Sequence, residues 1–318
     1  MSILDKYADE MLKSYTNDPQ GRYVSLLLVR RIESEAIFRT EGSGEAQNKE
    51  FVHAGLKDQA LIRRVVISKR KQTAAERRTG RELLRRHDLL YTPDGGDQVC
   101  ALNTNNPCGK CIDCMIYGYA AGGGGAQKSR VITDDAFSLH PASEVTDVRT
   151  FNAPFEDGTP WDREAQQRMT GLGADEYVRP EAVFLEIETL KDMTPDEIRY
   201  VLGNVLRTTR YGAISSRIGK VKNLLVGIAL SDCELFSNLE LTQAVYDQLK
   251  GDANELEFPL ETEAVVAATH DAAHVLSQRV IGHVKWMPRE EVEELVDELI
   301  GLYSDAEKVG AVLDRISY

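Results

Sequence analysis

The hydrophobic positions of this chain predict a sheet whose strands are widely separated in sequence. Tyr23–Arg30 is apolar on both faces in its middle, which is typical of a central strand. Leu61–Ile67 and Leu224–Leu230 are further apolar runs of strand length, and Val183–Thr189 alternates as a half-buried strand does. A shorter strand is expected to end within Arg130–Phe137.

Helical and irregular segments lie between these strands. Thr73–Arg86 has helical periodicity and follows Ser68–Gln72, which is interpreted as a polar connection. Thr194–Leu206 is expected to be a helix, because a capping threonine, a proline and two acids open it. Residues 255–318 are predicted to form a helical C-terminal part. Residues 146–181 mix glycine, proline and polar residues, which indicates a long, irregular hairpin that projects from the core.

Charge is distributed unevenly along the chain, whose net charge is −13. Leu61–Asp88 holds ten Lys and Arg against three acids, and Gly203–Asn223 holds five with no acid. Arg289–Tyr318, in contrast, holds three basic residues against nine acids. A protein with this distribution can bind a polyanion at one surface and stay soluble elsewhere, or can meet the basic face of a neighbouring copy.

Three basic segments have the composition of phosphate-binding surfaces, because they combine cations with hydroxyls and lie in or beside glycine-containing stretches. They are residues 69–81, 128–130 and 207–220. The alternative for each is a solvated basic face or an ordinary connection. We expect Tyr211 to offer a ring for base stacking. The candidate nucleic-acid-binding residues are Lys69, Lys71, Arg77, Arg78, Arg81, Lys128, Ser129, Arg130, Arg207, Arg210, Tyr211, Ser215, Ser216, Arg217 and Lys220.

Four of the five cysteines lie within 15 residues, in two overlapping CxxC motifs with one further upstream thiol. Thiolates at this spacing can converge on one tetrahedral Zn²⁺, so Cys100, Cys108, Cys111 and Cys114 are predicted to hold a structural zinc ion. A redox pair or a chance cluster is the alternative, and His87 is an alternative fourth ligand. The run Gly122–Gly125 that follows allows close approach to a ligand or forms a flexible linker.

Other candidate sites are weaker. Asp134 and Asp135 are suitable ligands for a divalent cation, although a turn at a strand end is the more common role. His270 and His274 are four residues apart and can share a helix face, but no HExxH motif accompanies them. We therefore expect packing or surface roles for the two histidines.

The chain shows neither a signal peptide nor a run of about 18 apolar residues, so we expect a cytoplasmic protein without a membrane partner. Clustered thiols are consistent with a reducing compartment.

Four stretches resemble the repeated backbone subunit of type I-D CRISPR effector (Cascade) complexes, which belongs to the Cas-seven family of the RAMP superfamily. The most specific is NNPCGKCIDCMIYGYAAGGGGAQKSRVITDDAFSL, residues 105–139. Arg64–Gln72 resembles the strand, turn and basic helix of the family. Glu176–Phe184 resembles the strand that follows the thumb, and Arg210–Arg217 resembles a late glycine-containing loop.

The resemblance implies an α+β fold: one RRM-like (ferredoxin-like) palm over residues 1–318, with an antiparallel sheet and helices packed on one face. It also implies a zinc-binding insertion at residues 90–128 and a thumb β-hairpin at residues 146–181. In this family, copies stack head to tail along a guide crRNA that pairs with a target DNA strand, together with other type I-D effector subunits. The implied role is that of a scaffold rather than an enzyme.

Two other classes of function are open at this point. One is a metal-dependent nuclease that cleaves a single-stranded target through Asp134 and Asp135. The other is a zinc-ribbon transcription factor, which would need a compact basic recognition element beside the ribbon. The basic residues here are instead spread over three distant segments.

Overall fold

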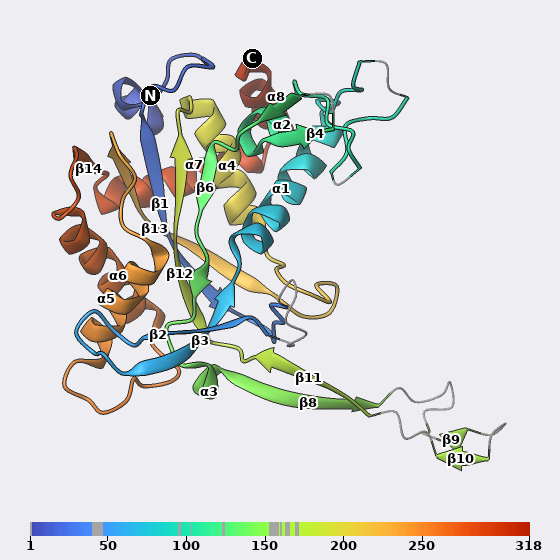
Figure 1. The fold of residues 1–318 in the computed structure, drawn as a ribbon. Coiled ribbons are helices and arrows are strands. Elements are labelled where there is room, and N and C mark those ends of the chain that lie inside the picture. Colours follow the sequence, from blue (N-terminus) through green and yellow to red (C-terminus); the bar gives the residue numbers. More distant parts are fainter. Residues whose placement is uncertain are drawn as a thin grey trace.

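The computed structural model describes residues 2–39, 47–94, 97–102, 104–122, 125–152, 159, 161–162, 166–168 and 172–318. Figure 1 shows a body of helices and strands from which one long hairpin projects. The α+β class with antiparallel sheets, expected above, is confirmed.

A five-stranded antiparallel sheet with the order β14-β13-β1-β12-β6 forms the centre of the body. Strand β1 (Tyr23–Ile32) lies in its middle, between β12 (Val183–Lys191) and β13 (Val221–Ser231). The edges are β6 (Val131–Thr133) and β14 (Val284–Trp286). The prediction of a central first strand is therefore confirmed.

Helices cover both faces of this sheet, whereas the resemblance implied one face. On one side, α1 (Lys69–Arg86), α4 (Pro195–Arg207), α7 (Arg289–Tyr303) and α8 (Ala306–Arg315) share a hydrophobic core with Leu26 and Leu28 of β1. On the other side, α5 (Asn238–Lys250) and α6 (Thr262–Ser277) share a second core with Leu27 and Val29. Because β1 is apolar on both faces, each face must be buried under helices to be removed from water.

Helix α1 begins at Lys69, so the expected polar connection Ser68–Gln72 is in fact its first turn. Ser68 is the N-cap residue, but its side chain makes no capping hydrogen bond. Instead, the Asp135 carboxylate accepts a hydrogen bond of 2.9 Å from the main-chain N–H of Lys69. A carboxylate there satisfies a free N–H and matches the helix dipole.

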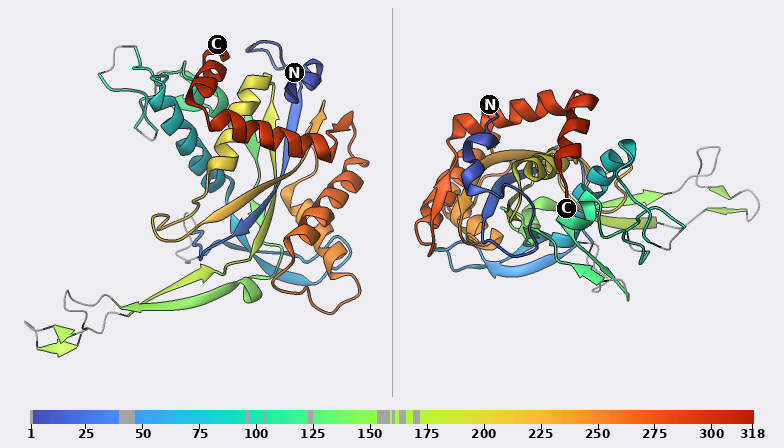
Figure 2. Two further views of the ribbon diagram at one scale, coloured as in Figure 1. Left: turned by 180° about the vertical axis from the view of Figure 1, so that it is seen from behind. Right: turned by 90° about the horizontal axis from the view of Figure 1, so that it is seen from above.

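A smaller sheet and the projecting hairpin lie below the central sheet in Figure 1. Strands β2 (Lys49–His53), β3 (Leu61–Ile67) and β7 (Ala136–Phe137) form the smaller sheet. Strands β8 (Thr146–Asn152) and β11 (Leu172–Val178) pair along seven residues and leave the body, as both views of Figure 2 show. We call this pair the arm.

Short elements complete the described part of the chain. They are η1 (Leu4–Glu10), α2 (Ile112–Tyr117), β4 (Tyr119–Ala121), β5 (Gly125–Gln127), α3 (Ala142–Val145), β9 (Trp161–Asp162) and β10 (Gln167–Arg168). Among the described residues, no helix combines the length and apolar character that crossing a membrane requires.

Candidate nucleic-acid interface and metal centre

A groove of about 540 Å³ lies between helix α1 and strand β6 and joins two of the three basic segments. Its lining includes Lys69, Arg70, Thr73, Arg77, Arg78, Ser129, Ile132 and Thr133. Lys69 and Arg78 are exposed on the helix side, and Ser129 is exposed on the other. The groove therefore presents positive charge, which attracts phosphate oxygens, while the Ser129 hydroxyl donates a hydrogen bond of 2.7 Å to the Val131 carbonyl.

The third basic segment forms a loop between α4 and β13, here called the 208–220 loop. Its backbone conformation requires glycine at two positions, because Gly212 and Gly219 have φ values of 84° and 80°. A Cβ at these positions would lie 2.4 Å from the Ile37 carbonyl oxygen and 2.1 Å from that of Tyr211. The loop thus folds against the chain after β1 and leaves its polar apex outside.

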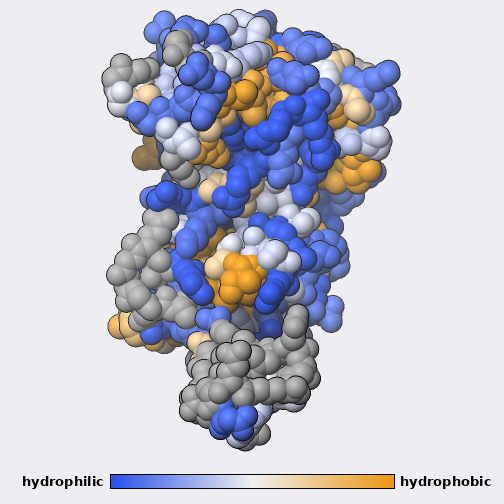
Figure 3. Space-filling model, turned by 90° about the vertical axis from the view of Figure 1, so that its right-hand side faces the viewer, coloured by the Kyte–Doolittle hydropathy of each residue, from blue (hydrophilic) through white to orange (hydrophobic). Residues whose placement is uncertain are grey.

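Most of the predicted RNA-binding side chains in this loop are exposed. They are Arg210, Ser215, Ser216, Arg217 and Lys220. Helix α1 and the loop both lie on the side from which the arm projects (Figures 1 and 2). Figure 3 faces that side, and hydrophilic residues cover most of its upper half above a small hydrophobic patch. We define the basic face as Lys69, Arg78, Lys128, Ser129, Arg210, Ser215, Ser216, Arg217 and Lys220, all exposed.

Three predicted RNA-binding residues are buried and bind the protein itself, so the expectation of direct RNA contact fails for them. Arg81 is only 5% exposed and pairs with Asp113. Arg130 is 8% exposed, pairs with Glu197 and donates hydrogen bonds to two main-chain carbonyls. Tyr211 is 1% exposed, so its ring cannot stack on a base.

Three others have intermediate exposure. The guanidinium of Arg77 donates hydrogen bonds of 2.8 and 3.0 Å to the Asp113 carboxylate. Lys71 donates a hydrogen bond to the main-chain carbonyl of Arg39, and Arg207 lies over the Tyr303 ring at 5.0 Å. Contacts with protein groups therefore engage all three side chains, although Arg77 also lines the groove.

Sequence reasoning missed Asp113, a fully buried carboxylate in the segment between two cysteines. It accepts hydrogen bonds from Arg77 and Arg81 of helix α1, and Arg81 also lies 3.7 Å from the Cys100 sulfur. Burial alone lowers the pKa of Arg81, but the Asp113 charge outweighs it, so this pKa is raised above its usual value. Only one feature of the sequence pointed to this role for Asp113, namely an acidic residue inside the cysteine motif of a chain that also has a strongly basic helix.

A second buried network holds helix α1 and the 208–220 loop to the sheet. The guanidinium of Arg30 lies 2.7 Å from Glu76 of α1 and 2.5 Å from Glu186 of β12. It also donates a hydrogen bond of 2.9 Å to the Tyr211 hydroxyl, which itself donates to Glu76 at 2.9 Å. Because Glu188 lies 3.9 Å from Arg30, three carboxyl groups surround one cation.

The excess of acids in this network changes their protonation. Burial raises the pKa of Glu186 to about 7, although the nearby Arg30 charge opposes the shift. Burial, together with Glu76 and Glu186, raises the pKa of Glu188 well above its usual value. Protons therefore neutralise part of the buried negative charge at neutral pH.

The four clustered cysteines converge, as their spacing predicts. Their sulfur atoms all lie within 4.8 Å of one another, with Cys100 3.6 Å from Cys114 and 4.0 Å from Cys111. Sulfurs bound to one tetrahedral ion at about 2.3 Å would be about 3.8 Å apart, so the donors fit a metal. His87 is not in this cluster, and its ring lies beside Gly310.

The two neighbouring aspartates have different surroundings. Asp135 caps helix α1, as described above, whereas the Asp134 side chain is exposed. Among the described residues, the only group of three or more potential metal ligands is the cysteine cluster. The structure thus gives Asp135 a structural role, and Asp134 lines a pocket together with one other acid, Glu234.

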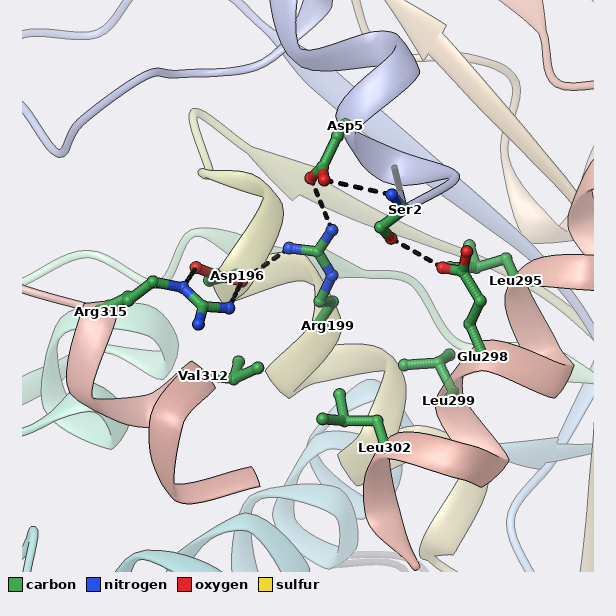
Figure 4. Close-up of a pocket in the computed structure, with 10 residues that line it drawn as sticks. All are labelled: Ser2, Asp5, Asp196, Arg199, Leu295, Glu298, Leu299, Leu302, Val312 and Arg315. Carbon is green, nitrogen blue, oxygen red and sulfur yellow. Dashed lines mark hydrogen bonds and ion pairs between the residues drawn. The ribbon is translucent and has the colours of Figure 1, made fainter. Parts of the chain in front are cut away.

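A second cavity, of about 390 Å³, lies between η1, α4, α7 and α8 (Figure 4). Arg199 pairs with Asp5 at 2.7 Å and with Asp196 at 2.6 Å, and Arg315 pairs with Asp196 at 2.7 Å. Because these cations already face carboxylates, the cavity has little attraction for a polyanion.

Comparisons with known proteins identify relatives of the chain. A sequence model of the Csc2 CRISPR family matches residues 10–313. The crystal structure of Thermofilum pendens Csc2 is similar, with a TM-score of 0.64 and 17% identity over 99% of this chain and 96% of that chain. A chain of a CRISPR RNA-guided surveillance complex gives a TM-score of 0.50 and 11% identity, over 88% of this chain and 98% of that one. No curated protein sequence matches.

Proposed function

Because the chain belongs to the Csc2 CRISPR family, we propose that it is a non-catalytic backbone subunit that binds guide crRNA in a type I-D effector complex. Copies of the chain stack head to tail along the guide, beside other effector subunits in the cytoplasm. The guide then pairs with a target DNA strand, so base pairing supplies the sequence specificity.

The basic face supports this proposal most directly. Its nine residues come from three distant parts of the sequence, and the helix α1 and the 208–220 loop, which carry seven of them, lie on the side from which the arm projects. Their side chains are ammonium, guanidinium and hydroxyl groups, which bind phosphate and ribose oxygens and do not distinguish bases. A subunit that must hold guides of any sequence needs this kind of surface.

The remaining parts have supporting roles in the proposal. The central sheet and its helices act as the RRM-like palm, and the arm acts as a thumb that folds over the bound RNA. Residues 90–128 form the zinc-binding insertion. When bound, Zn²⁺ cross-links Cys100, Cys108, Cys111 and Cys114, and the folded insertion places Asp113 against helix α1.

A scaffold is favoured over a nuclease by the surroundings of the aspartate pair. Asp135 is engaged in capping helix α1, and among the described residues Asp134 belongs to no group of three or more potential metal ligands, which makes it a poor site for a catalytic cation.

The test is RNA affinity against salt concentration for Arg78→Ala and Arg217→Ala, with two RNAs of equal length and unrelated sequence. Each variant should weaken binding to both RNAs equally and reduce the slope of log K against log salt by about 0.7, the value for one single-strand phosphate contact. Arg289→Ala is the control, because Arg289 is an exposed arginine in the acidic C-terminal part. If all three variants behave alike, the basic face does not bind RNA.

A further inference from the structure

Two histidines on helix α6 meet at an unusually short distance. The Nε2 atoms of His270 and His274 lie 3.1 Å apart, and the two ring centroids are 4.3 Å apart. Both side chains have intermediate exposure, so water and small ions reach them. Helix α6 lies at the opposite end of the body from α2 and the cysteine cluster (Figure 1). The pair is therefore separate from the thiolate site.

The distance between the two Nε2 atoms matches the distance expected when both nitrogens bind the same metal ion. Two imidazole nitrogens bound to one ion at about 2.0–2.1 Å lie about 2.9 Å apart at a 90° angle and about 3.4 Å apart at a tetrahedral angle. The observed 3.1 Å lies between these limits. Without an ion, only one of the two nitrogens can carry a hydrogen in this space, so the other directs a lone pair toward it.

The neighbouring residues hold the rings in this arrangement. The Trp286 indole packs against the His274 ring with centroids 4.5 Å apart. The indole N–H donates a hydrogen bond of 3.1 Å to the Ser277 hydroxyl, and that hydroxyl donates to the His274 carbonyl at 2.8 Å. On the other ring, the Asp271 carboxylate lies 3.7 Å from Nδ1 of His270. A carboxylate behind a histidine favours the tautomer whose Nε2 is free to bind a metal.

We propose that His270 and His274 form a bidentate site for a divalent transition-metal ion that prefers nitrogen ligands. Zn²⁺, Ni²⁺ and Cu²⁺ fit this description, with Cu²⁺ bound most tightly, as imidazole sites follow the general order of metal affinity. Two protein ligands leave the remaining coordination positions to water. Mg²⁺ and Ca²⁺ are excluded, because both prefer oxygen ligands.

Trp286 offers a direct reporter, because it packs on a proposed ligand and is one of only two tryptophans. In the full chain carrying Trp161→Phe, Trp286 is the sole tryptophan. The thiolates are first saturated with Zn²⁺ and the excess is removed. Ni²⁺, a paramagnetic ion that does not oxidise thiols, is then titrated at pH 7.5. We expect saturable quenching with one ion per chain.

The matched variants are His270→Ala and His283→Ala in the same background. Loss of an outer-shell partner alone lowers metal affinity by about 10–100-fold, so His270→Ala should lower Ni²⁺ affinity at least tenfold. His283 is exposed and precedes β14, so its loss should change nothing. Because His270 does not pack on Trp286, its replacement keeps the reporter intact. His270→Gln, judged by calorimetry with Ni²⁺, gives a second reading that does not depend on fluorescence.

Two results would overturn the proposal. One is quenching that never saturates, which means collision with free ion. The other is an unchanged Ni²⁺ affinity in both His270 variants, which places the ion elsewhere. Bound Ni²⁺ should also raise the melting temperature of the parent protein, but not that of His270→Ala, because an ion that binds only the folded state stabilises it.

Discussion

Replacing Asp113 should show how firmly the cysteine segment is joined to helix α1. The carboxylate is fully buried and accepts hydrogen bonds from Arg77 at 2.8 and 3.0 Å and from Arg81 at 2.5 Å. In Asp113→Ala, the Arg81 guanidinium stays buried without its counter-charge. Arg77 can turn toward solvent, because its side chain is 19% exposed.

The expected loss of stability follows from this geometry. Removing one member of a buried ion pair costs about 3–5 kcal/mol, and the partial exposure of Arg77 places the effect near the lower end. Asp113→Asn keeps the shape and an acceptor oxygen, so its cost should be smaller, about 1.5–3 kcal/mol. The free energy of unfolding is measured by urea titration at fixed Zn²⁺, together with the zinc content of each variant.

A double variant separates the ion pair from general damage to the core. Asp113→Ala combined with Arg81→Met removes both charges, so it should be less destabilised than Asp113→Ala alone. RNA affinity should fall in Asp113→Ala as well, because α1 carries Lys69 and Arg78. A loss below about 1 kcal/mol for Asp113→Ala, or a double variant that is simply additive, would refute the reasoning.

Two further predictions concern buried carboxyl groups and the aspartate pair. The folded protein retains protons on Glu186 and Glu188 that the unfolded chain releases, so the free energy of unfolding should fall as pH rises from 4.5 to about 7, the pKa of Glu186. Glu188→Gln should flatten this pH dependence in urea titrations between pH 5 and 8. An unchanged slope of stability against pH would contradict the prediction. Asp135→Ala should cost about 1 kcal/mol through the lost cap of α1, while Asp134→Ala should be neutral in thermal melts. If the double variant instead keeps RNA binding and loses a metal-dependent cleavage of single-stranded target, the scaffold proposal is wrong.

The sequence predicts strands and helices well where hydrophobic periodicity is strong. Tyr23–Arg30 has apolar residues on both faces, a pattern typical of a central strand, and it forms one. The start of α1 was misplaced because Ser68–Gln72 is polar, and the carboxylate that stabilises its first turn comes from Asp135, more than sixty residues later. Contacts between distant segments leave no local signal.

The same limit applies to the predicted RNA-binding residues. A count of cations cannot distinguish Arg78, which is exposed, from Arg81, which is one turn away and paired with Asp113. Tyr211 looked like a stacking platform because its neighbours are basic and polar, yet its hydroxyl binds Arg30 inside the body. The cysteine cluster was predictable, since the spacing of its ligands is local.

The position of β1 also constrains how the chain is made. This strand is synthesised first, but both of its neighbours, β12 and β13, lie more than 150 residues downstream. Until Ser231 has left the ribosome, Tyr23–Ile32 lacks the neighbouring strand β13, and the helices α5 and α6 that cover one of its apolar faces are synthesised later still. Folding of the central sheet is therefore completed late in synthesis, and the nascent chain exposes an aggregation-prone apolar strand in the meantime.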